Sequence, residues 1–303
     1  MVNASSSSEV PIDESLVRDL LLAQCPVLDG VDTSTLSLAH FANGWDNEIW
    51  SLGDRWLVRM PRRAVAASLV ENEQRWLPVL ASRLSIPIPV PVFAGTPSGG
   101  YPWRWSVVPR FFGDIAARSS LVDAEREAVR LAQFLRELHV PAPVEAPTNP
   151  FRGLPVAEIE VKYRIRRDRQ HDRLLREGRD VRELDRIMEI GLRAPLHEGE
   201  SAWVHGDLHI GNVLVSDGSL SAVIDWGDIC SGDAACDLQI AWMMFDADAR
   251  DAFFGAYGEG FPGLAERSRA WAAHSALVYL DNDEGDPLMT LMANTVLDRL
   301  LGN

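Results

Sequence analysis

Two short apolar runs around an Asp-Gly pair constrain the fold more than any other feature of this sequence. Residues 212–215 and 220–224 are strand-like, and Ser216-Asp217-Gly218-Ser219 separates them. Asp-Gly between apolar runs is a strong signal for a tight antiparallel hairpin, because both turn residues readily adopt positive φ angles. The hairpin returns the chain at residue 225 close to residue 212, so polar groups at these two strand ends lie near each other.

Polar residues occupy both ends of the predicted hairpin. His205-Gly206-Asp207-Leu208-His209-Ile210-Gly211-Asn212 leads into the first strand, and Asp225-Trp226-Gly227 follows the second. The hairpin therefore brings the Asn212 amide and the Asp225 carboxylate together, and closely spaced oxygen ligands suit a hard cation such as Mg²⁺. Asp207 lies five residues before Asn212 on the entering loop. From there it can face the same cavity as a base for an incoming hydroxyl.

The two histidines of this loop allow a second interpretation. His205 and His209 are four residues apart, as in a zinc-binding helix, but Gly206 and Gly211 disfavour a helix and no third ligand is nearby. A structural hydrogen-bonding role within the loop is the simpler interpretation of His205.

The spacing of Asp207, Asn212 and Asp225 is that of a phosphoryl-transfer catalytic loop. On these residues the chain resembles the aminoglycoside phosphotransferase family, small-molecule kinases that share the protein-kinase fold. The resemblance extends over about residues 36–281 and is specific mainly in residues 203–238. It implies that Asp207 is the catalytic base or the group that orients the hydroxyl, and that Asn212 and Asp225 hold Mg²⁺. It also implies that His205 and Asp237 support the catalytic loop.

The amino-terminal third carries a weaker form of the same resemblance. Ala42-Asn43-Gly44-Trp45-Asp46-Asn47 resembles the family's substitute for a glycine-rich loop, so Asn43 and Gly44 are candidates for binding the nucleotide. Arg59 stands where protein kinases place a lysine, and the resemblance pairs it with a helix glutamate, for which we choose Glu73 over Glu71. An arginine stays charged and binds bidentately, so it can hold phosphates. The alternative is that Arg59 is an ordinary exposed strand residue.

Lysine is almost absent from this chain. Lys162 is the only one, which leaves 28 arginines among the 29 basic residues. Any role that a lysine plays elsewhere must therefore fall to arginine here.

A strand over residues 105–109 is expected to form the hinge of the kinase-like fold. In that fold a free backbone amide and carbonyl read the adenine edge, and Ser106, Val107 and Val108 are the candidates. This assignment follows from position in the fold alone.

Charge and cysteine content narrow the class of protein. The net charge of −15 would repel an extended phosphate backbone, so nucleic acid is not an expected partner. Three cysteines are too few for a disulfide framework, and the first residues do not form a signal peptide. We expect no membrane segment, a reducing cytoplasmic location, and a monomer or homodimer.

Hydrophobic periodicity predicts an α+β chain of two lobes. Residues 1–107 are expected to form a small antiparallel-sheet N-lobe with one main helix over 65–84, after a disordered tail at 1–9. Residues 108–303 are expected to form a larger, mostly helical C-lobe that carries the hairpin. Further helices are predicted over 13–25, 123–139, 157–194, 234–245, 249–257, 265–281 and 287–301.

The resemblance implies an ATP-dependent kinase, with GTP as a possible donor, that phosphorylates a hydroxyl of a small molecule. Acidic residues near or after the catalytic segment suit a cationic acceptor such as an aminoglycoside: Asp228, Asp233, Asp281, Asp283 and Glu284. Solubility is the other explanation of these acids, and Asp233 is equally a turn residue. Kinases of macrolides, peptide antibiotics, choline, homoserine or sugars, and a catalytically silent binding module, are the alternatives.

One further cluster is basic. Seven arginines lie between Arg164 and Arg179 in the predicted helical stretch. They are interpreted either as a solvated helix pair or as a site for anionic groups.

Overall fold

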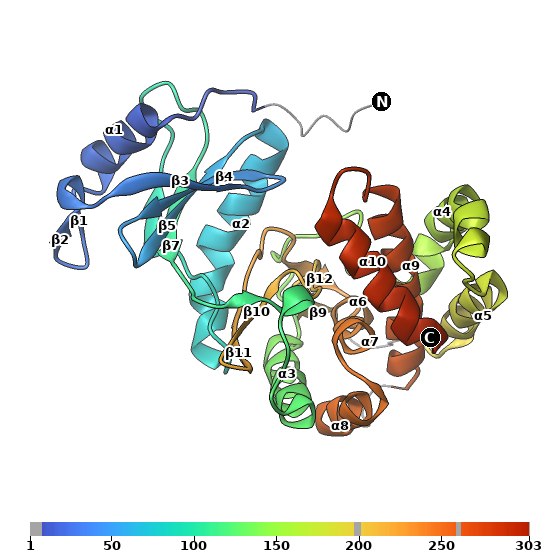
Figure 1. Cartoon of the computed structure of the whole chain (residues 1–303). Coiled ribbons are helices and arrows are strands. Elements are labelled where there is room, and N and C mark those ends of the chain that lie inside the picture. The colour runs from blue at the N-terminus through green and yellow to red at the C-terminus, as the bar shows by residue number, and fades with distance from the viewer. Residues whose placement is uncertain (1–7, 197–200, 259–261, 303) are drawn as a thin grey trace. The chain divides into compact units, whose positions relative to one another are not determined.

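A computed structural model describes residues 8–196, 201–258 and 262–302 (Figure 1). The chain divides into two compact units. The first contains residues 1–82 and 87–112, and the second contains residues 83–86 and 113–303. The predicted boundary at 107/108 falls inside a strand of the first unit's sheet, so the division lies five residues later than expected.

The first unit is built on a five-stranded antiparallel sheet of order β3-β4-β5-β7-β6. Its other elements are two helices, a small hairpin and two 3₁₀ turns. The strands of the sheet are β3 (Leu38–Asn43), β4 (Asn47–Leu52), β5 (Trp56–Pro61), β6 (Phe93–Gly95) and β7 (Trp105–Pro109). The remaining elements are α1 (Glu14–Gln24), α2 (Ala64–Leu80), the hairpin β1 (Val27–Leu28) and β2 (Val31–Asp32), η1 (Thr33–Thr35) and η2 (Ala81–Arg83).

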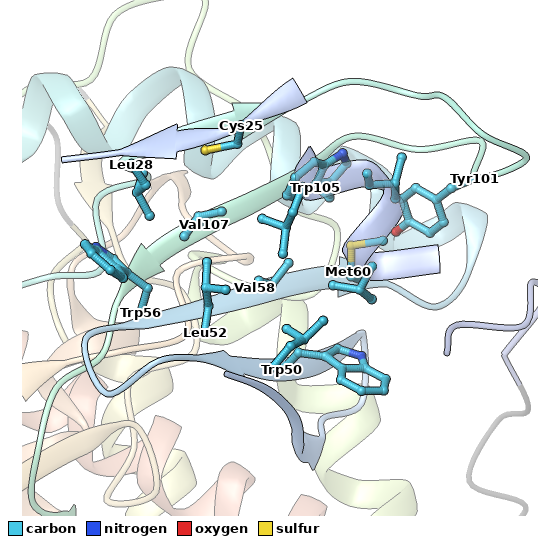
Figure 2. Packing of buried hydrophobic residues seen from close by; sticks show 14 residues of the cluster. Cys25, Leu28, Trp50, Leu52, Trp56, Val58, Met60, Tyr101, Trp105 and Val107 are labelled. Atoms are coloured by element: carbon cyan, nitrogen blue, oxygen red, sulfur yellow. The ribbon is translucent and has the colours of Figure 1, made fainter. Parts of the chain in front are cut away.

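One face of this sheet forms the first unit's core. Trp50, Val58 and Val107 follow one another across β4, β5 and β7, because the register pairs Trp50 with Val58 and Val58 with Val107. Buried side chains of α1, including Leu20 and Leu21, complete the cluster, and Figure 2 shows its strand residues. Because side chains alternate along a strand, Arg59 on β5 points to the opposite face, where α2 packs.

Two features of this unit bear on the sequence analysis. The buried stripe of α2 runs through Val70, Glu73 and Leu77, so it includes a charged side chain. Its burial is offset by an ion pair described below. Residues 1–7 of the expected tail lie outside the described residues, but Ser8 and Glu9 are ordered. The Glu9 N–H donates to the carbonyl of residue 62 at 2.8 Å, and its carboxylate accepts the first amide of α2 at 3.0 Å.

The second unit is mainly helical, as predicted, and carries short antiparallel strands. Its strands are β8 (Asp114–Ile115), β9 (Ala202–Val204), β10 (Val213–Ser216), β11 (Ser219–Val223) and β12 (Cys230–Gly232). Its helices are η3 (Ala116–Arg118), α3 (Ala124–Leu138), α4 (Val156–Arg176), α5 (Val181–Arg193), α6 (Ala235–Leu238), α7 (Ile240–Met244), α8 (Ala247–Tyr257), α9 (Leu264–Asp281) and α10 (Pro287–Leu301). Helix α3 packs on α8, and α9 packs against α4, α5 and α10.

The hairpin predicted from the Asp-Gly pair is present. Ser216 of β10 pairs with Ser219 of β11, and Asp217 and Gly218 have φ angles of 51° and 75°. These two positive angles are those of a tight two-residue hairpin turn. The sequence did not reveal β8, which adds a third strand by pairing Ile115 with Leu214.

Two expectations from the composition, on the cysteines and on membrane segments, can be compared with the structure. Cys25, Cys230 and Cys236 are free thiols, and all three are buried. In the described ranges of the chain, no helix combines the length and the apolar character that crossing a bilayer requires.

Candidate active site

The loop over residues 205–212 connects β9 to β10 and is held by one buried carboxylate. Asp237 of α6 accepts the backbone N–H of His205 at 2.6 Å and that of Gly206 at 2.9 Å. The His139 ring, at the end of α3, is 3.2 Å from the same carboxylate. Burial alone raises the pKa of Asp237, but the hydrogen bonds and charge of His139 and His205 lower it overall. Asp237 is therefore an ionised anchor beneath the loop.

His205 ties the loop to the end of β11. Its Nε2 donates to the carbonyl of Ile224 at 3.0 Å, and its Nδ1 accepts the N–H of Asp207 at 3.3 Å. The ring lies 4.6 Å from that of Trp226, measured between centroids. Both ring nitrogens are thus used in holding the loop's shape.

Asn212 and Asp225 are brought together by the hairpin. The carbonyl of Asn212 accepts the N–H of Ile224 at 2.9 Å, which places Asp225 next to it. The side-chain Nδ2 of Asn212 donates to the carbonyl of Asp207 at 3.0 Å, so the amide oxygen points the opposite way. Asp225 is exposed and has a φ of 62°, a backbone state that non-glycine residues adopt mainly at functional sites and turns.

This donor set fits Mg²⁺, which takes one or two protein oxygens and keeps its other positions for water and phosphate. Among the described residues, no three His, Cys, Asp or Glu side chains gather as a metal site. An amide and a carboxylate oxygen from Asn212 and Asp225 are the candidate ligands instead.

Asp207 is the candidate base, and an arginine stands beside it. Nη2 of Arg152 lies 2.7 Å from Oδ1 of Asp207, and Nε2 of His209 lies 3.6 Å from Oδ2. Burial alone raises the pKa of Asp207, but Arg152, with smaller effects of His209 and His205, holds it well below its usual range. Asp207 is therefore ionised at neutral pH and ready to accept a hydrogen bond from a hydroxyl.

Sequence reasoning missed Arg152. It lies in the proline-rich connection before α4, 76 residues from Asp228, whose Oδ2 is 3.4 Å from its Nε. Asn149 donates to the other oxygen of Asp228 at 2.7 Å. No local spacing marks Arg152, because its partners are distant in sequence.

The acidic residues expected to attract a cationic acceptor are largely paired. Asp228 binds Arg152, and Asp233 binds the fully buried Arg267 at 2.9 Å and accepts the N–H of Ala235 at 3.0 Å. Both carboxylates already neutralise an arginine, so their expected contact with an acceptor's ammonium groups gains no support from this pairing and stays a prediction.

Arginines of α4 form ion pairs with two further acidic residues. Asp281 lies 2.7 Å from Arg169 and 2.9 Å from Gln170, and Asp283 binds Arg173 through both carboxylate oxygens, at 3.0 and 2.6 Å. These basic residues thus join α4 to the end of α9.

In the first unit, Arg59 and Glu73 form a buried ion pair. Nη1 of Arg59 donates to the Glu73 carboxylate at 2.5 Å, whereas Glu71 is exposed. Arg59 is therefore a buried, fixed cation and not the exposed strand residue of the alternative interpretation.

The β3–β4 turn contains Asn43 and Gly44. The Gly44 N–H donates to the carbonyl of Asn47 at 2.9 Å, and the Asn43 side chain accepts from the His40 ring at 2.8 Å. Arg62 binds the Gly44 carbonyl at 3.2 Å, so neighbouring arginines fix the turn. The Gly44 amide is thus engaged within the turn.

The proposed adenine-reading residues lie on β7. Ser106 and Val107 are paired with β5 on one side and β6 on the other, and the Val107 carbonyl accepts the N–H of residue 92 at 2.8 Å. A strand paired on both sides offers no free backbone edge, so the pairing disfavours Ser106 and Val107 as adenine-reading residues, and that role stays a prediction. Val108 lies beyond the β6 pairing and keeps its candidacy.

Taken together, a sheet with a buried Arg–Glu pair and a helical unit with this Asp, Asn and Asp loop define the class of kinase-like phosphotransferases. The chain belongs to the phosphotransferase enzyme family, whose sequence model matches residues 37–273. It is accordingly a small-molecule kinase.

Solved structures carry the same fold. The GDP complex of aminoglycoside 2'-phosphotransferase-IIIa is 18% identical with a TM-score of 0.65, over 96% of this chain and 100% of that one. Macrolide 2'-phosphotransferase MphH from Brachybacterium faecium is 21% identical with a TM-score of 0.61, over 93% and 98%. The streptomycin–ATP complex of APH(2")-IIa is 17% identical with a TM-score of 0.56, over 96% and 99%. No curated protein matches the chain.

Proposed function

We propose that this enzyme transfers the γ-phosphoryl group of ATP or GTP to a hydroxyl of a small molecule. The observation that carries the proposal is the position of the ionised Asp207 carboxylate on a loop that Asp237 and His205 hold rigid, next to Asn212. Structures with the same fold were solved with GDP and with ATP, which supports a nucleoside triphosphate as donor.

In this reaction the protein mainly positions its substrates, because phosphoryl transfer requires little covalent work from the enzyme. Asp207 accepts a hydrogen bond from the acceptor hydroxyl and orients it. Asn212 and Asp225 would hold Mg²⁺, which would neutralise charge on the phosphate oxygens.

The first unit supplies the nucleotide contacts in this proposal. Arg59, fixed by Glu73, binds the phosphates, and its charge persists at any physiological pH. We assign the turn at Asn43 and Gly44 to the phosphate end of the nucleotide and Val108 to its base.

The second part of the proposal concerns the chemical class of the acceptor. Structures with the same fold include a kanamycin complex of APH(2")-IIIa and macrolide phosphotransferases, so amino sugars and macrolides are both candidates. The expectation of a cationic acceptor rested on acidic residues, and four of these are paired with arginines in the structure. We therefore propose a hydroxyl-bearing small molecule without assigning it a positive charge.

Replacement of Asp207 tests the proposal. We expect Asp207→Asn to lower kcat by a factor of about 10²–10⁴, with nucleotide affinity unchanged, because the amide cannot accept the hydroxyl proton. Nucleotide consumption is measured with ATP and GTP against aminoglycosides, macrolides, amino alcohols and sugars.

Asp217→Asn is the matched control, since Asp217 is an exposed turn residue of the same hairpin. Wild-type turnover by Asp207→Asn contradicts the proposed base. Magnesium-dependent nucleotide binding without turnover of any acceptor favours the silent binding module.

A further inference from the structure

Arg152 occupies the space beside the candidate base. Nη2 lies 2.7 Å from Asp207, and Nε lies 3.4 Å from Asp228. These two contacts leave the hydrogens of Nη1 for another group. The guanidinium is thus a built-in cation at the point where an acceptor hydroxyl must arrive.

The segment that carries Arg152 is firmly attached. Asn149 donates to Asp228 at 2.7 Å, so the second anchor of the guanidinium is itself fixed. The carbonyl of Gly153 accepts the N–H of Asp233 at 2.8 Å, and the carbonyl of Pro147 accepts that of Ser231 at 2.8 Å. Residues on both sides of Arg152 are therefore bonded to the chain that follows Asp225.

Two more cations lie on α4, the helix that follows Arg152. Lys162 places its ammonium 4.7 Å from the centre of the Phe151 ring, and no carboxylate pairs with it among the described residues. Arg166, one turn further along α4, is paired with Asp281 at 3.4 Å. Lys162 therefore adds a positive charge beside the residue that precedes Arg152.

An acceptor hydroxyl bound to Asp207 lies about 3 Å from that carboxylate, and thus within a few ångströms of the Arg152 guanidinium. Substituents on the carbons next to this hydroxyl are therefore within the range at which the guanidinium charge acts on them. An ammonium group there meets a like charge, and both nearby carboxylates already have a cationic partner.

We propose that Arg152 is a specificity-determining residue of this enzyme and that it selects acceptors with a neutral or anionic group, not an ammonium group, beside the reacting hydroxyl. The proposal rests on the proposed function and names the acceptor class for the same site.

Kanamycin, a polycation, is the probe. Its binding to the protein saturated with Mg²⁺ and a non-hydrolysable ATP analogue is measured by calorimetry for the wild type and Arg152→Gln. We expect the affinity to rise by about tenfold or more in Arg152→Gln, since one like charge is removed at short range. A purely structural role of Arg152 would lower the affinity instead.

Two variants control the result. Arg182→Gln removes the same charge from a side chain that is 95% exposed, so kanamycin affinity stays at the wild-type value. Arg152→Lys keeps the charge and also stays at that value. Equal affinity in the wild type and Arg152→Gln, or an equal gain in Arg182→Gln, overturns the proposal.

The wild type alone decides the matter if Arg152→Gln does not fold. A kanamycin Kd weaker than about 1 mM supports the proposal, and a tighter one overturns it. This measurement requires no turnover, so its failure is distinct from that of the phosphotransfer proposal, which the Asp207→Asn experiment tests.

Discussion

His274 is a buried imidazole whose surroundings oppose protonation. It lies on α9 with 7% of its surface exposed, and its Nδ1 makes no hydrogen bond within the described part of the chain. Burial, followed by the charges of Arg166, Arg152 and Lys162, lowers the pKa of His274 from 6.5 to about 3. The folded protein therefore holds this histidine neutral where an unfolded chain would take up a proton.

Stability at mildly acidic pH is expected to depend on His274. Between pH 6.5 and about 3 the unfolded state binds a proton that the folded state refuses, so the free energy of unfolding falls as pH falls. We expect this to cost the wild type about 2 kcal/mol at pH 5 relative to pH 7, and His274→Gln to lack this loss. Urea denaturation at the two pH values measures it, with the exposed His171→Gln as control. Identical pH dependence in wild type and His274→Gln would contradict the prediction, because it would show that His274 takes up its proton in the folded protein as readily as in the unfolded chain.

At the scale of single residues, the sequence indicates groups whose spacing is local. Asp207, Asn212 and Asp225 lie on one loop and one hairpin, so their proximity follows from short-range geometry. Arg152 has partners far along the chain, and only tertiary packing brings them together. The same limit explains the acidic residues: the sequence shows their charge but not that four of the five have an arginine beside them.

Secondary structure elements likewise divide into those that local sequence patterns predict and those that depend on tertiary pairing. The hairpin and the long helices were predicted because turn chemistry and hydrophobic period act over a few residues. Strand β8 has two residues and exists through its pairing with β10, so it left no pattern to detect. On α2 the buried stripe includes Glu73, which looks like a surface position until its bond to Arg59 is seen.

Gly218 gives a test at this scale. Its φ is 75°, and an added Cβ would lie 2.3 Å from Cγ2 of Val122. We expect Gly218→Ala to lower the free energy of unfolding by about 1–3 kcal/mol, since alanine disfavours this angle and has no space here. Chemical denaturation measures the change. Gly255→Ala is the control, because Gly255 lies inside α8 with open space around it and alanine favours helix there. Equal effects of the two changes would contradict the turn argument.

At the scale of the whole molecule, net charge is a poor guide to the acceptor. The chain carries a charge of −15, yet the group beside Asp207 is a guanidinium, and arginines of α4 neutralise Asp281 and Asp283. A sum over all residues describes long-range attraction and solubility, whereas recognition depends on charges within a few ångströms of the ligand. The composition argument for a cationic acceptor stays untested, and it moves from the first scale to the second without a local observation to support the step.

Ligand binding is measurable on the whole molecule through stability. A nucleotide that binds only the folded protein adds RT ln(1 + [L]/Kd) to its stability, about 2.7 kcal/mol at a concentration of 100 Kd. We expect ATP or GTP with Mg²⁺ to raise Tm, and EDTA to remove most of the rise. Asp225→Asn should reduce the magnesium-dependent part, because a neutral amide binds Mg²⁺ more weakly than a carboxylate, while Asp217→Asn should behave as wild type. If the rise is the same with EDTA as with Mg²⁺, the nucleotide binds without the metal and Asn212 and Asp225 lose their assigned role. If only Asp225→Asn abolishes the difference between the two conditions, the carboxylate after β11 is the metal ligand.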